Sequence, residues 1–161
     1  LRDTEDNVHK KQGSRQMKKV NIYSDGACSR NPGPGGYGVI LEYKGHEVEL
    51  SGGEEDTTNN RMELMGVITG LEALKEPCDV TLVTDSRYVT DAFNKGWIYQ
   101  WQSKNWKKAN GKAVLNKELW QRLLRAAVPH RVKFVHVPGH KGHSYNERCD
   151  KLAVEARKKF E

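Results

Sequence analysis

Residues 18–51 read KKVNIYSDGACSRNPGPGGYGVILEYKGHEVELS, and they contain three β-prone segments separated by two turn signals. The first segment, residues 20–23, alternates and predicts a strand that ends near Asp25. The NPGPGG run at residues 31–36 predicts a turn before a second strand over 37–43. A reversal at residues 44–45 then leads into a third strand, about 46–51. Three strands joined in this way predict an antiparallel meander.

The rest of the chain alternates helical and extended patterns. Apolar residues at 64, 68 and 71 predict a helix that begins near residues 57–60, where Asn60 with Glu63 resembles a capping box. We also predict strands at 80–83 and 131–137 and helices at 86–94, 117–128 and 144–156. This order favours an α/β fold with a five-stranded mixed sheet. Parallel strands extend the antiparallel meander, and helices cover both faces.

Length and composition limit the organisation of the chain. Its 161 residues suit one domain, and we expect a flexible tail over residues 1–17 followed by a domain over 18–161. No apolar run approaches the ~18 residues of a membrane helix. Three cysteines without metal-binding spacing are typical of reduced thiols. We therefore expect a cytoplasmic monomer without membrane contact, and the net charge of +6 favours a polyanionic partner.

Four acids fall at the ends of predicted elements. Asp25 follows the first strand and Asp85 follows the fourth, while Glu63 and Asp150 lie in the first turns of two helices. Sites in open α/β sheets form outside the carboxyl ends of strands. If these two strands are parallel neighbours, all four acids can meet there. Taken singly, each acid could instead be a turn, cap or surface residue.

Four clustered carboxylates would repel one another strongly unless cations compensate their charge. Carboxylate oxygens suit Mg²⁺ or Mn²⁺. Two such ions about 3.5–4 Å apart can activate a water and stabilise the leaving oxygen of an in-line phosphoryl displacement. The acids therefore favour a metal-dependent phosphoryl-transfer site.

The chain resembles the type 1 ribonuclease H family, most closely its bacterial branch, in four strings that occur in the family's order. They are SDGAC with NPGPGGYG at residues 24–38, TTNNRMEL at 57–64, TDSRY at 84–88, and GHKGH with NERCD at 139–150. The resemblance implies a ribonuclease H-like fold. It also implies endonucleolytic hydrolysis of the RNA strand of an RNA–DNA hybrid, which leaves 5′-phosphate and 3′-hydroxyl ends.

The resemblance also assigns roles to residues. It implies two Mg²⁺ ions per active site with substrate, with Mn²⁺ as the alternative, held by Asp25, Glu63, Asp85 and Asp150. His140 matches the family's mobile histidine, which assists proton movement or product release. The chain departs from the family pattern at Arg30, Arg87, Pro138 and Ser144-Tyr145. None of these departures replaces an acid.

A segment of about residues 92–117 contains six lysines and no acid, interleaved with aromatic residues. It could be an amphipathic helix pair with a solvated lysine face. The resemblance instead implies a basic protrusion that binds the DNA strand. We expect hybrid contacts from this segment and from polar residues that can reach phosphates, sugars and RNA 2′-hydroxyls. The predicted contacts are Asn31, Thr58, Asn59, Asn60, Trp97, Trp101, Lys104, Trp106, Lys107, Lys108 and Asn116.

Three alternative functions remain to be compared. A resolvase or integrase with this kind of sheet would share the acids, but it would not share the NNRME string or the basic protrusion. A ribonuclease H domain of a reverse transcriptase would follow a polymerase, and residues 1–17 show no such pattern. A catalytically inactive hybrid-binding module would be expected to lack an acid, and all four are present.

Overall fold

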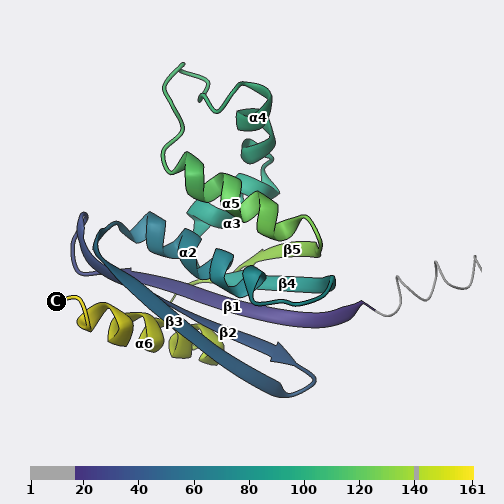
Figure 1. Ribbon diagram of the computed structural model, residues 1–161, viewed down its shortest axis with the longest axis vertical. Helices are drawn as coiled ribbons and strands as arrows, with labels where there is room; N and C mark the ends of the chain where they lie inside the picture. The colour runs from purple at the N-terminus through teal and green to yellow at the C-terminus, as the bar shows by residue number, and fades with distance from the viewer. Residues whose placement is uncertain (1–16, 140–141) are drawn as a thin grey trace, which may run out of the picture.

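The computed structural model describes residues 17–139 and 142–161 (Figure 1). The predicted tail over 1–17 therefore lies outside the described residues except for Met17. The elements, in chain order, are β1 (Lys18–Cys28), β2 (Gly33–Tyr43), β3 (His46–Thr57), α2 (Asn59–Glu72), β4 (Cys78–Thr84), α3 (Arg87–Asn94), α4 (Trp97–Ser103), α5 (Lys117–Ala127), β5 (Arg131–His136) and α6 (Ser144–Lys158).

The five strands form one mixed sheet in the order β3-β2-β1-β4-β5. Strands β1, β2 and β3 pair antiparallel, whereas β4 pairs parallel with β1 and with β5. Helix α6 covers one face of the sheet, and α2, α3 and α5 lie on the other (Figure 1). The predicted architecture is confirmed, including the parallel placement of β1 beside β4.

The turn expected over residues 31–36 is wrong in its second half, because β2 begins at Gly33. Two of its glycines, Gly36 and Gly38, lie where α6 approaches the strand closely. A Cβ at Gly36 or Gly38 would clash with backbone atoms of α6. The third strand is also longer than expected and continues to Thr57. The glycines at these positions therefore indicate close contact between a helix and the sheet, and they do not indicate a turn.

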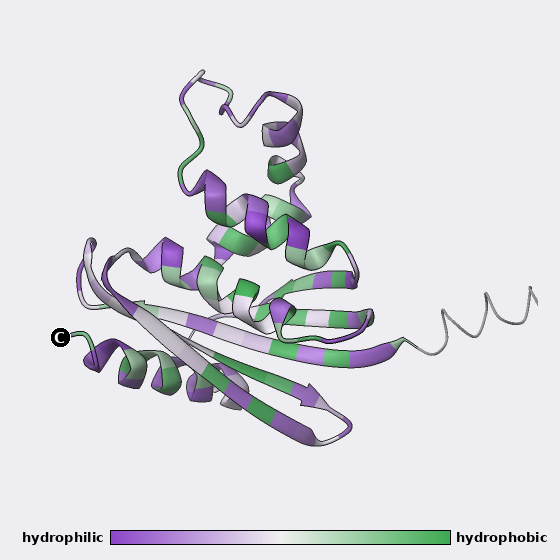
Figure 2. Cartoon of the chain, in the orientation of Figure 1, coloured by the Kyte–Doolittle hydropathy of each residue, from purple (hydrophilic) through white to green (hydrophobic). Residues whose placement is uncertain are grey.

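Successive side chains of β1 point to opposite faces of the sheet, so one set packs in the core and the other faces α6. Ile22 and Ser24 face α2, because added Cβ atoms on two α2 glycines would come closest to them. Tyr23 and Asp25 consequently face α6. The core between the sheet and α2 includes the fully buried Ile22, Leu82 and Leu64. Hydrophobic residues are prominent on β4 and β5, and hydrophilic ones lie at the tip of the β2–β3 hairpin (Figure 2).

The structure shows which side chains cap two of the helices. The side chain of Thr58 caps α2 by accepting a hydrogen bond from the backbone N–H of Arg61 at 3.2 Å, so the predicted Asn60–Glu63 capping box is wrong. At α6 the N-cap is His143, whose Nδ1 accepts from the N–H of Asn146 at 3.3 Å, and the helix starts at Ser144. Because Thr58 caps α2, the Glu63 carboxylate is not needed to cap the start of this helix.

The segment expected as a protrusion projects from the sheet and contains α4 and the loop that follows it (Figure 1). Trp106 is 9% exposed. Its ring centroid lies 6.5 Å from that of Trp101, which in turn lies 5.4 Å from that of Trp120 in α5. Aromatic packing therefore connects the projecting segment to α5.

No helix in the two described ranges combines the length and the apolar character that crossing a membrane requires. The three cysteines all lie in described segments and are free thiols, two of them buried. The structure thus contains no covalent cross-link through these cysteines.

Candidate active site

Three of the predicted metal ligands meet where the parallel pairing of β1 with β4 ends, at Ser24 and Thr84. The expected end of the first strand near Asp25 is wrong, because β1 continues to Cys28 in its pairing with β2. Asp25, Glu63 and Asp85 each offer a carboxylate oxygen, and these oxygens lie within 4.8 Å of one another. Asp150 lies close enough for its charge to raise the pKa of both Asp25 and Glu63. We call these four residues the acid cluster. The expected convergence is confirmed for Asp25, Glu63 and Asp85, and metal ligation by the four acids stays a prediction.

Each acid reaches the cluster for a local reason. Alternate residues of β1 face α6, and Asp25 is the last polar residue among them. Its side chain is 4% exposed. Asp85 follows β4, and the next helix is capped by Ser86, whose Oγ accepts from the N–H of Val89 at 3.3 Å. Asp85 is therefore not needed as a cap. Glu63 lies in the second turn of α2, on the side that packs on β1 at Gly26.

Burial and mutual repulsion dominate the electrostatics of the cluster. Burial, and then the charges of Asp85 and Asp150, raise the pKa of Asp25 from 3.8 to about 8. Burial and the charges of Asp25 and Asp85 raise the pKa of Glu63 well above its ordinary value. The N–H of Gly26 donates to Asp25 Oδ1 at 2.9 Å, which offsets only part of this effect. The folded chain therefore holds the fully ionised cluster at a large free-energy penalty.

The donor set fits a divalent cation. Among the described residues, no donor lies within hydrogen-bond distance of the buried Oε1 of Glu63. A buried carboxylate oxygen without a partner is rare in folded proteins. A cation placed between the acids would satisfy this oxygen and neutralise the repulsion, and all-carboxylate ligation suits Mg²⁺ or Mn²⁺.

Gly139 closes the cluster on the side of the last strand. A Cβ at this position would come within 2.6 Å of Asp85 Oδ2, so a larger residue here would displace the carboxylate from its present position. The next residue, His140, lies outside the described residues, and its predicted role stays a prediction. The chain nevertheless reaches the cluster immediately before His140.

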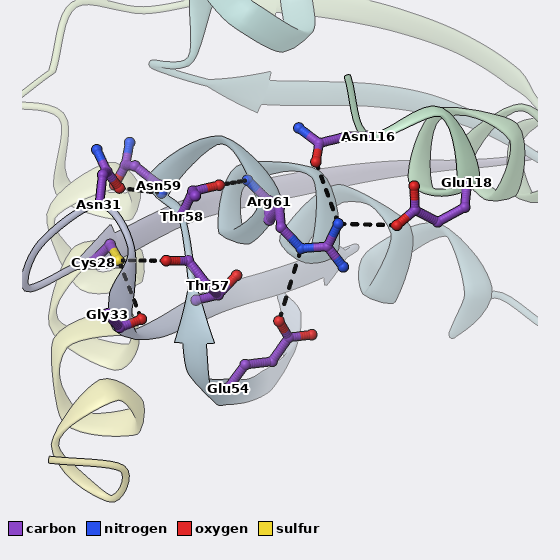
Figure 3. Close-up of polar contacts among 10 residues, drawn as sticks. All are labelled: Cys28, Asn31, Gly33, Glu54, Thr57, Thr58, Asn59, Arg61, Asn116 and Glu118. Atoms are coloured by element: carbon purple, nitrogen blue, oxygen red, sulfur yellow. Dashed lines mark hydrogen bonds and ion pairs between the residues drawn. The ribbon is translucent and has the colours of Figure 1, made fainter. Parts of the chain in front are cut away.

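A second group of predicted residues surrounds the start of α2 (Figure 3). The backbone N–H of Asn59 donates to Asn31 Oδ1 at 2.8 Å. Thr58 caps the helix, as described above, and Asn60 is exposed. Asn31, from the loop between β1 and β2, therefore lies beside the start of α2, to which Thr58, Asn59 and Asn60 belong. Their predicted contacts with a nucleic acid stay predictions.

Arg61 joins this group to α5 (Figure 3). Its Nη1 donates to Asn116 Oδ1 at 3.3 Å and to Glu118 at 3.0 Å, and its Nε lies 4.0 Å from Glu54. Asn116 has a left-handed backbone with φ of 61°, and its Nδ2 donates to the hydroxyl of Tyr88 at 3.1 Å. The Asn116 amide is thus held at both ends and has a fixed orientation.

The residues predicted on the protrusion have different environments. Lys104, Lys107 and Lys108 are exposed, so their charges are available to a polyanion. Trp97 is 40% exposed, with Lys95 Nζ 5.4 Å from its ring centroid. Trp101 and Trp106 pack into the aromatic contacts with α5. They support the segment from inside, and direct contact with a nucleic acid stays a prediction for both.

Sequence reasoning missed three residues that shape this region: Arg61, Tyr88 and Gly139. An arginine directly after two predicted contact residues is a signal for Arg61. Gly139 is part of a quoted string, but nothing in the sequence indicates its close approach to Asp85. For Tyr88 we find no local signal, because its partners Asn116 and Trp120 are about thirty residues away in sequence.

Comparisons with known proteins match nearly the whole described chain. The family model described as RNase H matches residues 17–158. A curated relative named Ribonuclease H from Desulforamulus reducens is 56% identical over 142 residues, covering 88% of this chain and 89% of the relative. Another from Thermus thermophilus is 54% identical over 136 residues, covering 84% of this chain and 82% of the relative.

Solved structures show the same architecture. The crystal structure of LC9-RNase H1, described as a type 1 RNase H with the type 2 active-site motif, has a TM-score of 0.80 and 35% identity. That match covers 90% of this chain and 74% of the other. LC11-RNase H1 in complex with an RNA/DNA hybrid has a TM-score of 0.66 and 26% identity, covering 87% of this chain and 97% of the other.

Proposed function

The chain belongs to the ribonuclease H family, and we propose that it hydrolyses the RNA strand of RNA–DNA hybrids with two divalent metal ions, leaving 5′-phosphate and 3′-hydroxyl ends. The observation that carries the proposal is the acid cluster. Three buried or half-buried carboxylates meet within 4.8 Å, with Asp150 beside them. Mg²⁺ is the proposed cofactor, with Mn²⁺ as an alternative.

The acid cluster would hold the metal ions through Asp25, Glu63, Asp85 and Asp150. When bound, such ions supply a water activated as a nucleophile and stabilise the charge on the leaving oxygen. The chain's own contribution is placement. The two aspartates at the strand ends are fixed by the sheet, and burial of Asp25 and Glu63 limits competing water. His140 would move a proton at the leaving or attacking oxygen, as the family motif implies.

Two surfaces would hold the hybrid. Asn31, Thr58, Asn59, Asn60 and Asn116 offer amide and hydroxyl groups that suit sugar, phosphate and base-edge atoms, and 2′-hydroxyl contacts would identify the RNA strand. The exposed lysines of the protrusion would bind phosphates of the DNA strand, with support from Trp97, Trp101 and Trp106. The hybrid bound by the relative LC11-RNase H1 supports this assignment.

Further features of the proposal concern the whole chain. We propose that residues 18–161 form a single catalytic domain that works as a monomer in the cytoplasm. The single continuous sheet supports one domain. The free thiols of the three cysteines suit a reducing compartment.

The test is cleavage of end-labelled substrates with and without Mg²⁺. An RNA–DNA hybrid should be cut in its RNA strand only with the metal, and RNA and DNA duplexes of the same sequence should stay intact. Asp85→Asn should fold and bind hybrid but not cleave it, and Asp79→Asn at the start of the preceding strand, β4, is the matched control. Near-normal Mg²⁺-dependent cleavage by Asp85→Asn would refute the metal-site assignment. Hybrid binding without cleavage by the wild type would favour the inactive hybrid-binding module.

A further inference from the structure

Tyr145 in the first turn of α6 stacks on Tyr23 of β1. The ring centroids are 4.1 Å apart and the ring planes differ by 4°. The Tyr145 hydroxyl donates to Glu47 of β3 at 2.7 Å. The beginning of α6 is therefore joined to two strands that are not neighbours in the sheet.

Arg148, one turn further along α6, strengthens the same connection. Its Nη2 lies 2.9 Å from Glu47 Oε1 and 2.8 Å from Glu49 Oε2. Its guanidinium carbon lies 5.4 Å from the ring centroid of Tyr145. We call Tyr23, Glu47, Glu49, Tyr145 and Arg148 the α6 anchor. Exposed ion pairs contribute little to global stability, so the effect of the anchor is mainly on position.

The α6 anchor lies beside the acid cluster. Tyr23 and Asp25 are two residues apart on the same face of β1. Asp25 pairs with Gly38, where an added Cβ would clash with the carbonyl oxygen of Cys149. Asp150 is the next residue of α6 and is five residues from Tyr145, about 7.5 Å along the helix axis. The helix thus runs along β1 from the tyrosine stack to the acids.

Given the proposed metal-dependent activity, we infer that Tyr145 is a positioning residue that holds Asp150 beside Asp25 by fixing the start of α6 on β1. The glycine contacts in β2 set the distance between helix and sheet, because backbone meets backbone there. They restrain sliding and rotation of the helix less than two parallel rings do. Removal of the Tyr145 ring should therefore let Asp150 withdraw from the other three acids.

The experiment measures Mn²⁺ binding to the substrate-free protein by calorimetry. Tyr145→Ala removes the ring, and Tyr145→Phe keeps the ring but removes the hydroxyl. Tyr43→Ala is the matched control, because Tyr43 is a half-buried tyrosine at the end of β2 that pairs with His46 and packs against the core on the opposite face of the sheet from α6. Thermal unfolding of each variant in EDTA reports the purely structural effect.

We expect Tyr145→Ala to weaken Mn²⁺ binding about tenfold, the lower range for loss of a residue that orients a metal ligand. Tyr145→Phe should stay within about twofold of wild type, and Tyr43→Ala should lower stability without changing binding. Unchanged Mn²⁺ binding in Tyr145→Ala, with wild type binding normally, would overturn this inference alone. Absence of Mn²⁺ binding in the wild type would overturn the proposed metal site itself.

A pair of charge-neutralising substitutions covers the case in which Tyr145→Ala does not fold. Arg148→Gln breaks the anchor, and Arg157→Gln breaks an ion pair with Glu161 at the other end of α6, 3.0 Å long. Loss of a positive charge alone should tighten cation binding. Weaker binding in Arg148→Gln but not in Arg157→Gln would support positioning, and tighter binding in both would contradict it.

Discussion

Asp25→Asn should change how stability depends on pH in the absence of metal. The pKa of Asp25 in the folded chain is raised from 3.8 to about 8 by burial and by the neighbouring acids. Between these two values the folded state binds more protons than the unfolded state. The free energy of unfolding must therefore fall as pH rises through this interval, and it is highest at the acid end.

The magnitude follows from the same values. Each pKa unit corresponds to about 1.4 kcal/mol, so the upper limit is roughly 6 kcal/mol for this carboxyl group. Small rearrangements that admit water relieve part of the repulsion, so we expect a loss of about 2–4 kcal/mol between pH 5 and pH 8. Asn keeps the size of Asp and can still accept the Gly26 hydrogen bond. Asp25→Asn should therefore be more stable than wild type at pH 8.

The assay is urea unfolding in EDTA at pH 5, 6.5 and 8 for wild type, Asp25→Asn and Asp79→Asn. Asp79 is a partly exposed aspartate outside the acid cluster, 4.0 Å from Arg131, so Asp79→Asn is the control for removal of one carboxylate. Mg²⁺ should restore stability to wild type at pH 8 and do less for Asp25→Asn. Equal pH slopes in wild type and Asp25→Asn would show that the cluster is not strained by charge.

Three further outcomes are expected. His140→Ala should slow hybrid cleavage yet leave activity measurable in single-turnover assays, because the metals carry the main chemistry; inactivity as complete as in Asp85→Asn would instead make it a ligand or an essential base. Gly66→Ala should stabilise the fold by about 0.5–1 kcal/mol in urea unfolding, since its Cβ would lie 3.4 Å from the nearest atom. Gly70→Ala should destabilise the fold by about 1–3 kcal/mol, because its Cβ would lie 2.8 Å from Ile22. Changes in the free energy of unfolding with the same sign for both variants would contradict this packing. Neutralising Lys104, Lys107 and Lys108 of the protrusion should weaken hybrid binding and flatten its salt dependence by about two log units per log unit of salt. Neutralising Lys151 and Lys158 of α6 together with Lys159, which follows it, should not, and an unchanged slope in the protrusion variant would favour a solvated helix face.

The sheet and the acid cluster were predictable because their signals are local. Alternation ended at Asp25, a buried strand ended at Asp85, and parallel pairing of two such strands brings their ends together. The position of Glu63 followed from the start of α2. Cap identity was less predictable, because Thr58, Asn59 and Asn60 are all good capping residues and only tertiary packing chooses among them.

Contacts between distant segments could not be predicted from the sequence. The glycines of β2 resemble a turn until α6 is placed on them. Trp106 lies among lysines in the sequence, which is typical of an exposed binding residue. Its packing on Trp101 in the structure shows that it is mostly buried. The stack of Tyr23 on Tyr145 joins residues more than a hundred positions apart. Each of these contacts depends on the path of a helix, which periodicity does not specify.

The burial of Asp25 gives α6 a chemical role as well as a structural one. Ile22 and Asp25 occupy opposite faces of one strand, so the sheet is apolar toward α2 and carries charge toward α6. Covering that charge with a helix removes water, which strengthens both the repulsion among the acids and their attraction for a cation. Metal binding and the docking of α6 must therefore stabilise each other. Without the metal, the charges that α6 covers repel one another, and without α6, water weakens the attraction of the acids for the metal. A residue such as Tyr145 can influence the metal without touching it.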